Sequence, residues 1–157
     1  MAIQDQKLSN NFRLSEMVKS STADRHGIDN WPTEQKIVDN LIKVVHNIVQ
    51  PVRDHYGVPF APNSGFRCLL LNRALKSKDT SQHVMGEAVD IEVPGISNYD
   101  LAEWIVNNCE FDQLLLEFYY PGRPTSGWVH ISYVDLSVNR KQILTINKNG
   151  TFIGLLT

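Results

Sequence analysis

The sequence predicts an α+β fold in which N-terminal helices pack on one face of a small, mainly antiparallel sheet. Three observations lead to this prediction: an apolar stripe at helical spacing in residues 34–56, short segments of alternating polarity after residue 88, and no internal repeat. The 157 residues suit one domain, with a helical part at 1–57 and a sheet part at 58–157.

The strongest helical signal runs from Glu34 to about Tyr56. Apolar residues recur on one side at helical spacing and polar residues on the other, which is typical of a helix that covers a core. Pro51 interrupts the segment, but the period continues to Val52, so we expect a kink rather than an end. Two shorter helices are expected at 68–76 and 99–109.

Strand-like alternation marks the second half of the chain. It occurs at 89–93, 113–119 and 128–134. A further hairpin is expected from 142–147 to 151–155, with its turn at Asn149-Gly150, because Asn-Gly is a strong signal for a two-residue hairpin loop.

Composition limits the classes of function. Hydrophobic residues make up 42% of the chain and charged residues 20%, which excludes a fully disordered protein. The formal net charge of −2 provides no basic field for nucleic acid, and no apolar run approaches the ~20 residues of a membrane span. We expect a monomer that binds neither nucleic acid nor membrane, with Cys68 and Cys109 as buried or half-buried thiols.

Titratable residues interrupt three of the apolar strand segments: Asp90, Glu117 and His130. A charge in such a position is costly unless it is paired or bound to metal. His83 lies in the polar stretch before the first of these strands. The alternatives are a surface hydrogen bond between His83 and Asp90, and a buried ion pair for Glu117.

Side-chain parity places Asp90, Glu117 and His130 on one face of the sheet, because successive side chains of a strand point to opposite faces. The apolar residues of the same strands share the other face: Val89, Ile91 and Val93; Leu114, Leu116 and Phe118; Val129, Ile131 and Tyr133. A symmetric hairpin centred in loop 120–127 would set Glu117 directly opposite His130, with Cβ atoms about 5 Å apart.

Two histidines and one aspartate can bind zinc and leave the fourth tetrahedral position for water. With a free carboxylate nearby, this is the layout of a catalytic zinc site and not of a closed structural one. We therefore expect one Zn²⁺ per chain at His83, Asp90 and His130, with Glu117 as general base.

These residues form motifs that resemble those of the zinc D-Ala-D-Ala carboxypeptidase family, peptidoglycan peptidases that share a fold with the hedgehog signalling domain. The first motif is Ser81-x-His83-x-x-Gly86-x-Ala88-x-Asp90, followed by Trp128-x-His130. A second is Ser64-Gly65-Phe66-Arg67 with Asn72, where Phe replaces the family's Tyr. The opening Phe12-x-Leu14-Ser15-Glu16 and the Asn30…Pro32 stretch resemble short phage and bacterial members, so the resemblance covers nearly the whole chain.

The resemblance implies zinc ligands at His83, Asp90 and His130, a substrate-side cation at Arg67, and a polar substrate contact at Ser81. The alternative for Arg67 is an ion pair with a surface carboxylate.

One departure from the family pattern concerns the catalytic carboxylate. Several relatives carry it three residues before the last histidine, where this chain has Gly127. The acid/base role then falls to Glu117, with Glu87 and Glu92 as the next candidates.

We expect a zinc metallopeptidase that hydrolyses a D-amino-acid-containing bond of the peptidoglycan stem peptide, as a carboxypeptidase or an endopeptidase. The alternative is a non-catalytic module of the same fold that binds cell-wall peptide or a protein partner, although such a module would not need three metal ligands and Glu117. The N-terminus has no apolar segment typical of a signal peptide. We expect synthesis in the cytoplasm and action on the cell wall after release, as a phage lysin, or within a virion.

Overall fold

The computed structural model describes residues 2–156, which form six α-helices, one π-helical turn and five strands. In chain order these are α1 (Leu14–Met17), α2 (Ser21–His26), α3 (Gln35–Val44), η1 (Val45–Val49), α4 (Gln50–Tyr56), α5 (Leu69–Ala74), β1 (Ala88–Ile91), α6 (Asn98–Asn108), β2 (Gln113–Glu117), β3 (Trp128–Ser132), β4 (Gln142–Asn147) and β5 (Gly150–Ile153). Among the described residues, no helix has both the length and the apolar character that crossing a bilayer requires.

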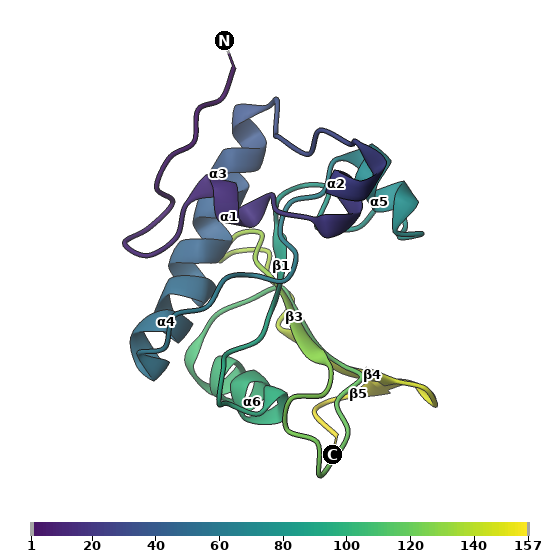
Figure 1. The fold of residues 1–157 in the computed structure, drawn as a ribbon. Helices are drawn as coiled ribbons and strands as arrows, with labels where there is room; N and C mark the ends of the chain where they lie inside the picture. Colours follow the sequence, from purple (N-terminus) through teal and green to yellow (C-terminus); the bar gives the residue numbers. More distant parts are fainter. Residues whose placement is uncertain (1, 157) are drawn as a thin grey trace.

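The five strands form one sheet in the order β1-β3-β2-β4-β5. In Figure 1 the sheet runs from β1, near α1 and α3, to β5 at the far edge. All neighbouring strands are antiparallel except β2 and β4, which run parallel. The prediction of an α+β fold with a mainly antiparallel sheet is therefore confirmed.

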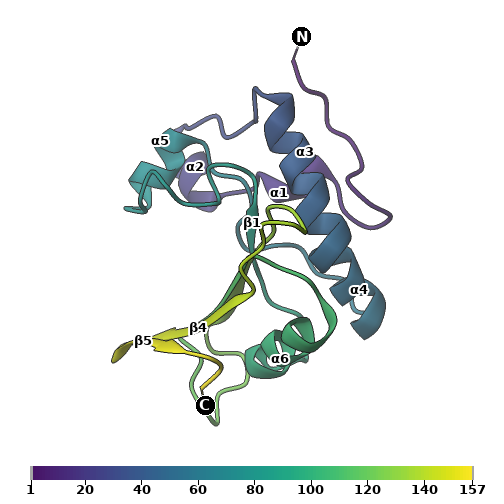
Figure 2. The same ribbon diagram turned by 180° about the vertical axis from the view of Figure 1, so that it is seen from behind.

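The continuous helix formed by α3, η1 and α4 lies together with α6 on one side of the sheet (Figure 2). The apolar side of this helix and the apolar face of the central strands belong to one hydrophobic cluster, in which Leu41, Val89 and Leu114 are fully buried. The parity prediction holds for this face, where Ile91, Leu116, Val129, Ile131, Val93 and Tyr133 are also buried.

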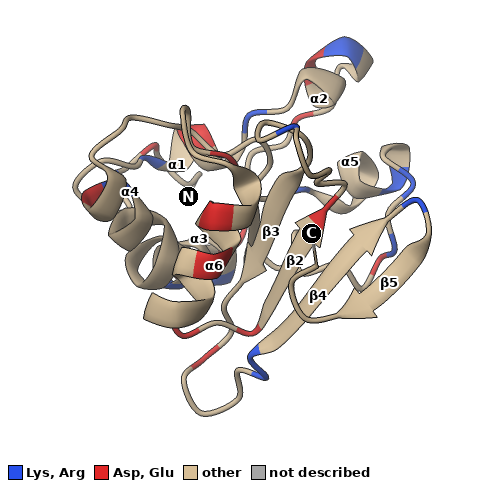
Figure 3. Ribbon diagram, turned by 90° about the horizontal axis from the view of Figure 1, so that it is seen from below, with Lys and Arg blue, Asp and Glu red and all other residues tan. Residues whose placement is uncertain are grey.

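Charge is almost absent from the strands, as Figure 3 shows. Their sequences contain only two Asp, Glu, Lys or Arg residues, Asp90 in β1 and Glu117 in β2. Both side chains line the same cavity on the face away from the hydrophobic cluster. The two charged side chains of the sheet therefore lie in one cavity.

The expected helix from Glu34 to Tyr56 is continuous, but it passes through a π-helical turn instead of a simple kink. The backbone N–H of Gln50 donates to the carbonyl of Val45, five residues earlier. This wider turn directly precedes Pro51, which has no N–H to donate to the preceding turn. The helix then ends at Gly57, whose left-handed φ of 66° is typical of a helix C-terminus.

Two further local predictions are wrong. The β4–β5 turn lies at Lys148-Asn149 and not at Asn149-Gly150, since Asn147 pairs with Gly150. Phe118 does not continue the core face of β2: its backbone is left-handed, with φ 55°, and its ring turns outward against Trp128. Cys68 is half-buried and Cys109 is buried, and both are free thiols, as expected; burial raises the pKa of Cys109 to about 11.

Candidate functional site

Asp90 and His130 face each other across the β1–β3 ladder, where they are register partners. The Nδ1 atom of His130 lies 3.0 Å from Oδ1 of Asp90. Both side chains are buried. Because side chains alternate along a strand, they point away from Val89, Ile91, Val129 and Ile131, which belong to the hydrophobic cluster. Two strands with alternating side chains thus bring together residues 40 positions apart.

His83 reaches the same place from the turn that precedes β1. Its Nδ1 lies 2.7 Å from the carbonyl oxygen of Gly65. A carbonyl only accepts hydrogen bonds, so Nδ1 carries the proton and donates it. The other nitrogen, Nε2, is left without a proton and lies 3.4 Å from Oδ1 of Asp90. A backbone partner that orients a histidine in this way is typical of metal ligands.

The three side chains form a cluster that could bind a metal ion. One ligand atom from each of His83, Asp90 and His130 lies within 4.8 Å of the other two. Two imidazole nitrogens and one carboxylate oxygen fit Zn²⁺, which binds these atom types and leaves a fourth tetrahedral position open at catalytic sites. The donor set and the tautomer of His83 therefore both fit the expected ion.

The electrostatics of the cluster favour the protonation states that bind metal. Burial opposes the ionisation of Asp90, but its contacts with the imidazoles of His130 and His83 outweigh burial and hold the pKa of this carboxyl well below its usual range. Burial lowers the pKa of His83. At neutral pH the site accordingly holds a carboxylate and a neutral His83, as metal coordination requires.

Arg67 forms the wall beside this cluster. Its Nε donates to Oγ of Ser64 at 3.0 Å, and one terminal nitrogen donates to Oδ2 of Asp90 at 3.3 Å. The side chain is only 14% exposed, and burial lowers the pKa of its guanidinium. The partner of Arg67 is therefore the candidate metal ligand Asp90 and not a surface carboxylate.

Ser81 lies on the rim of the same cavity. Its Oγ accepts a hydrogen bond from the backbone N–H of His83 at 3.3 Å. This contact helps to shape the turn that presents His83 to the cluster.

Glu117 lines the cavity with the cluster, but the predicted register of its hairpin is wrong. His130 pairs with Leu115, and Glu117 pairs with Trp128. A shift of two residues preserves parity, so Glu117 stays on the face of His130 as its diagonal neighbour. Burial raises the pKa of Glu117, and the charge on Asp90 raises it further, while His130 and Arg67 act in the opposite direction.

A family model described as Peptidase M15 matches residues 10–132. The chain belongs to the peptidase M15 family. The matched span contains all three residues of the cluster together with Arg67, Ser81 and Glu117. A search of curated proteins found no match.

In this member of the M15 family, the lining of the cavity shows which carboxylates lie near the metal cluster. Asp90 and Glu117 are the two acidic residues that line it within the described chain. Glu87 lies outside it, beside Gln82, and Glu92 is held by Asn63 at 2.7 Å, also outside it. Neither of these alternatives to Glu117 is placed to act on a group held at the cluster.

Sequence reasoning missed one group of cavity residues in this M15 chain. Arg140 lines the cavity and donates to the buried carboxylate of Asp112, at 3.0 Å from Nε and 2.7 Å from a terminal nitrogen. Gln82, next to His83, donates to the same carboxylate at 2.9 Å. Arg140 and Asp112 belong to no motif, and only the folded chain brings them to Gln82.

Proposed function

We propose that this M15 peptidase is a zinc enzyme that hydrolyses a D-amino-acid-containing peptide bond in the stem peptide of peptidoglycan. The observation that carries the proposal is the convergence of the His83, Asp90 and His130 cluster with Glu117 and Arg67 in one cavity of about 780 Å³. The family relationship supports peptide hydrolysis, and the similarity of the motifs to D-Ala-D-Ala carboxypeptidases supports the substrate class.

His83, Asp90 and His130 would hold the ion. When bound, Zn²⁺ supplies a Lewis acid that polarises the scissile carbonyl and lowers the pKa of water to about 7. The carbonyl of Gly65 orients His83 by accepting a hydrogen bond from Nδ1–H of the histidine. Arg67 orients Asp90 by donating a hydrogen bond to Oδ2. The two partners leave Nε2 of His83 and Oδ1 of Asp90 facing each other, 3.4 Å apart.

Glu117 acts as the general base and acid. Its carboxylate takes a proton from the attacking water and delivers it to the leaving amine, so that one water is consumed and a carboxylate and an amine are formed. Burial raises the pKa of Glu117, which brings it closer to the pH at which it must both accept and donate a proton.

Arg67 has a supporting role on the substrate side. Two of its nitrogens bond to Ser64 and Asp90, while the side chain also lines the cavity. A guanidinium in this position would stabilise negative charge that develops on the carbonyl oxygen during attack.

A non-catalytic module that binds cell-wall peptide is the alternative function. It would need the cavity but not a carboxylate such as Glu117 beside a candidate metal cluster. Purified peptidoglycan distinguishes the two functions. A peptidase releases new amine termini and soluble stem-peptide fragments, detected by mass spectrometry, and a zinc chelator abolishes both. Peptidoglycan that binds the zinc-loaded protein but stays intact would support the binding module and overturn the proposal.

A further inference from the structure

Two cavities share a wall at the candidate metal cluster. The larger, of about 780 Å³, and a second, of about 280 Å³, are both lined by Arg67, Asp90 and Trp128. His83 and His130 line the larger cavity, whereas Lys19 and the first residues of α2 line the second. The two cavities therefore lie on either side of the same three residues, next to the cluster.

The pairing of β1 places the two cavities on opposite sides of Asp90. On one edge of β1, Asp90 pairs with His130 of β3, and the larger cavity extends from there across β2 to Ile146 of β4. On the other edge, the N–H of Asp90 donates to the carbonyl of Ser64 at 2.7 Å. The second cavity lies beyond that contact, over Asn63 and Ser64.

We call the two cavities the larger arm and the smaller arm of the site. Polar groups suited to a peptide line both arms. In the larger arm, Lys78 provides positive charge, and Gln82 and Gln113 provide amides. In the smaller arm, Lys19 provides positive charge, and Ser21 and Thr22 provide hydroxyls. Amides and hydroxyls can pair with backbone N–H and C=O groups, and the lysines with the carboxylates of an acidic peptide.

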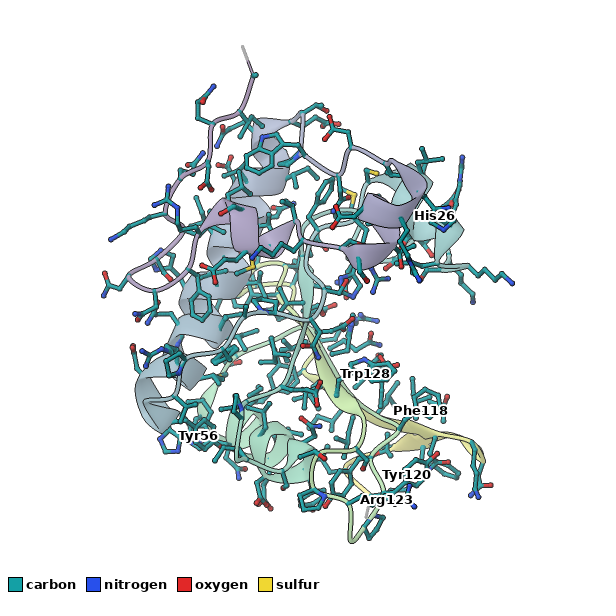
Figure 4. The ribbon with its side chains drawn as sticks, viewed as in Figure 1. His26, Tyr56, Phe118, Tyr120, Arg123 and Trp128 are labelled. Atoms are coloured by element: carbon teal, nitrogen blue, oxygen red, sulfur yellow. The ribbon has the colours of Figure 1, made fainter. Side chains whose placement is uncertain are left out.

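Trp128 connects the two arms. Its side chain lines both cavities and packs against the outward-turned ring of Phe118, with ring centroids 5.6 Å apart. Figure 4 shows both aromatic side chains on the opposite side of the molecule from Tyr56 of α4. Trp128 thus provides an aromatic surface common to both arms.

We propose that an acidic peptide crosses Asp90 and occupies both arms, so that the enzyme cuts an internal bond and is an endopeptidase. The proposal rests on the proposed function and specifies its substrate. The internal C–N bond breaks, the oxygen of one water joins the carbonyl carbon, and its protons end on the new carboxyl and amine groups. A carboxypeptidase would instead need a closed end next to the cluster. Here a second cavity adjoins the cluster, and Arg67, Asp90 and Trp128 line both cavities.

The test uses the synthetic stem pentapeptide L-Ala-γ-D-Glu-L-Lys-D-Ala-D-Ala with its C-terminus either as a free carboxylate or as a carboxamide. An endopeptidase cuts both peptides at the same internal bond, at rates within about threefold of each other, as mass spectrometry of the products would show. Release of the terminal D-Ala from the free acid alone would overturn the inference while leaving the proposed function intact. If neither peptide nor peptidoglycan were cut, the proposed function itself would fail, and this inference with it.

A matched pair of variants tests the smaller arm directly. Ser21 is exposed and lines that arm, whereas Thr33 is exposed and lines neither cavity. Ser21→Trp should lower cleavage of the carboxamide peptide at least tenfold with zinc content unchanged, and Thr33→Trp should leave the rate at the wild-type level. Equal rates in the two variants would show that substrate does not enter the smaller arm, and would overturn the proposal.

Discussion

The α-carbon of Gly127 lies against the backbone of Glu117. A side chain at 127 would overlap the carbonyl oxygen of Glu117 and approach the carbonyl carbon of Phe118 to 2.6 Å, and φ at this glycine is +69°. A carboxylate at this position is therefore sterically excluded in this chain. The backbone of Glu117–Tyr119 fills the space, and Glu117 brings the carboxylate into the cavity from the neighbouring strand.

We predict that Gly127→Ala lowers the free energy of unfolding by about 2 kcal/mol or more, because it combines a left-handed backbone with a collision between backbone atoms. Gly122→Ala is the matched control, since Gly122 has φ +82° but a Cβ added there would meet no atom within 4 Å. That control should lose only about 1 kcal/mol. Urea denaturation measures both values, and equal losses would contradict the steric explanation.

If the cluster binds zinc, removing one of its side chains should remove the metal. His83→Ala and Asp90→Ala each remove one of three ligand atoms, so we expect zinc content to fall from one per chain to near zero. Loss of bound metal should also remove its stabilisation, which is about 2.7 kcal/mol when free metal is at 100 times Kd. His26→Ala, at an exposed histidine of α2, is the control and should keep its zinc. Full zinc in both ligand variants would show that the ion binds elsewhere.

Arg67→Lys should keep the positive charge but lose the geometry of the guanidinium, which now bonds to Ser64 and Asp90 together. We expect kcat to fall at least about tenfold while zinc stays bound. Arg73→Lys is the control, because Arg73 forms an exposed ion pair with Asp79. Wild-type turnover in Arg67→Lys would limit Arg67 to a structural role.

The lowered pKa of Asp112 predicts how the free energy of unfolding depends on pH. Hydrogen bonds from Arg140 outweigh burial and lower the pKa of this carboxyl. A carboxyl whose pKa is lower in the folded state stabilises the fold above its unfolded pKa of about 4, and this stabilisation is lost as the pH falls through the folded pKa. Asp112→Asn should thus cost about 1–3 kcal/mol at pH 7 and progressively less below pH 4.

Urea denaturation of chelator-treated protein between pH 7 and pH 3 measures this difference without a contribution from metal release. Glu103→Gln is the control, at an exposed position of α6, and should change stability little at any pH. A deficit for Asp112→Asn that stays constant or grows below pH 4 would contradict the assigned role of the Asp112–Arg140 pair.

Side-chain parity was predictable because it depends only on the pleat of each strand. It correctly placed Asp90, Glu117 and His130 on one face, whatever the register of the strands. The register itself was not predictable, because the turn geometry of loop 118–127 determines it. Phe118 takes a left-handed backbone there, and Glu117 pairs with Trp128 instead of His130.

The approach of His83 to the cluster was predictable from motif spacing, but the contacts that hold it were not. Its hydrogen bond to Gly65 and the link from Arg140 to Gln82 through Asp112 join segments that are distant in the sequence. The smaller cavity depends on α2 lying near β1, which no periodicity indicates. Contacts of this kind arise from tertiary packing and leave no local pattern.

Glu117→Gln tests the catalytic centre most directly, because it preserves the shape of the side chain and removes the base. The measurement is peptide hydrolysis by this variant together with its zinc content. We predict one zinc per chain, as in the wild type, and a rate lowered by about 10²–10⁴-fold, the usual contribution of a general base. Hydrolysis at the wild-type rate, or loss of zinc from the variant, would contradict the assignment of Glu117 as the base beside a metal held by His83, Asp90 and His130.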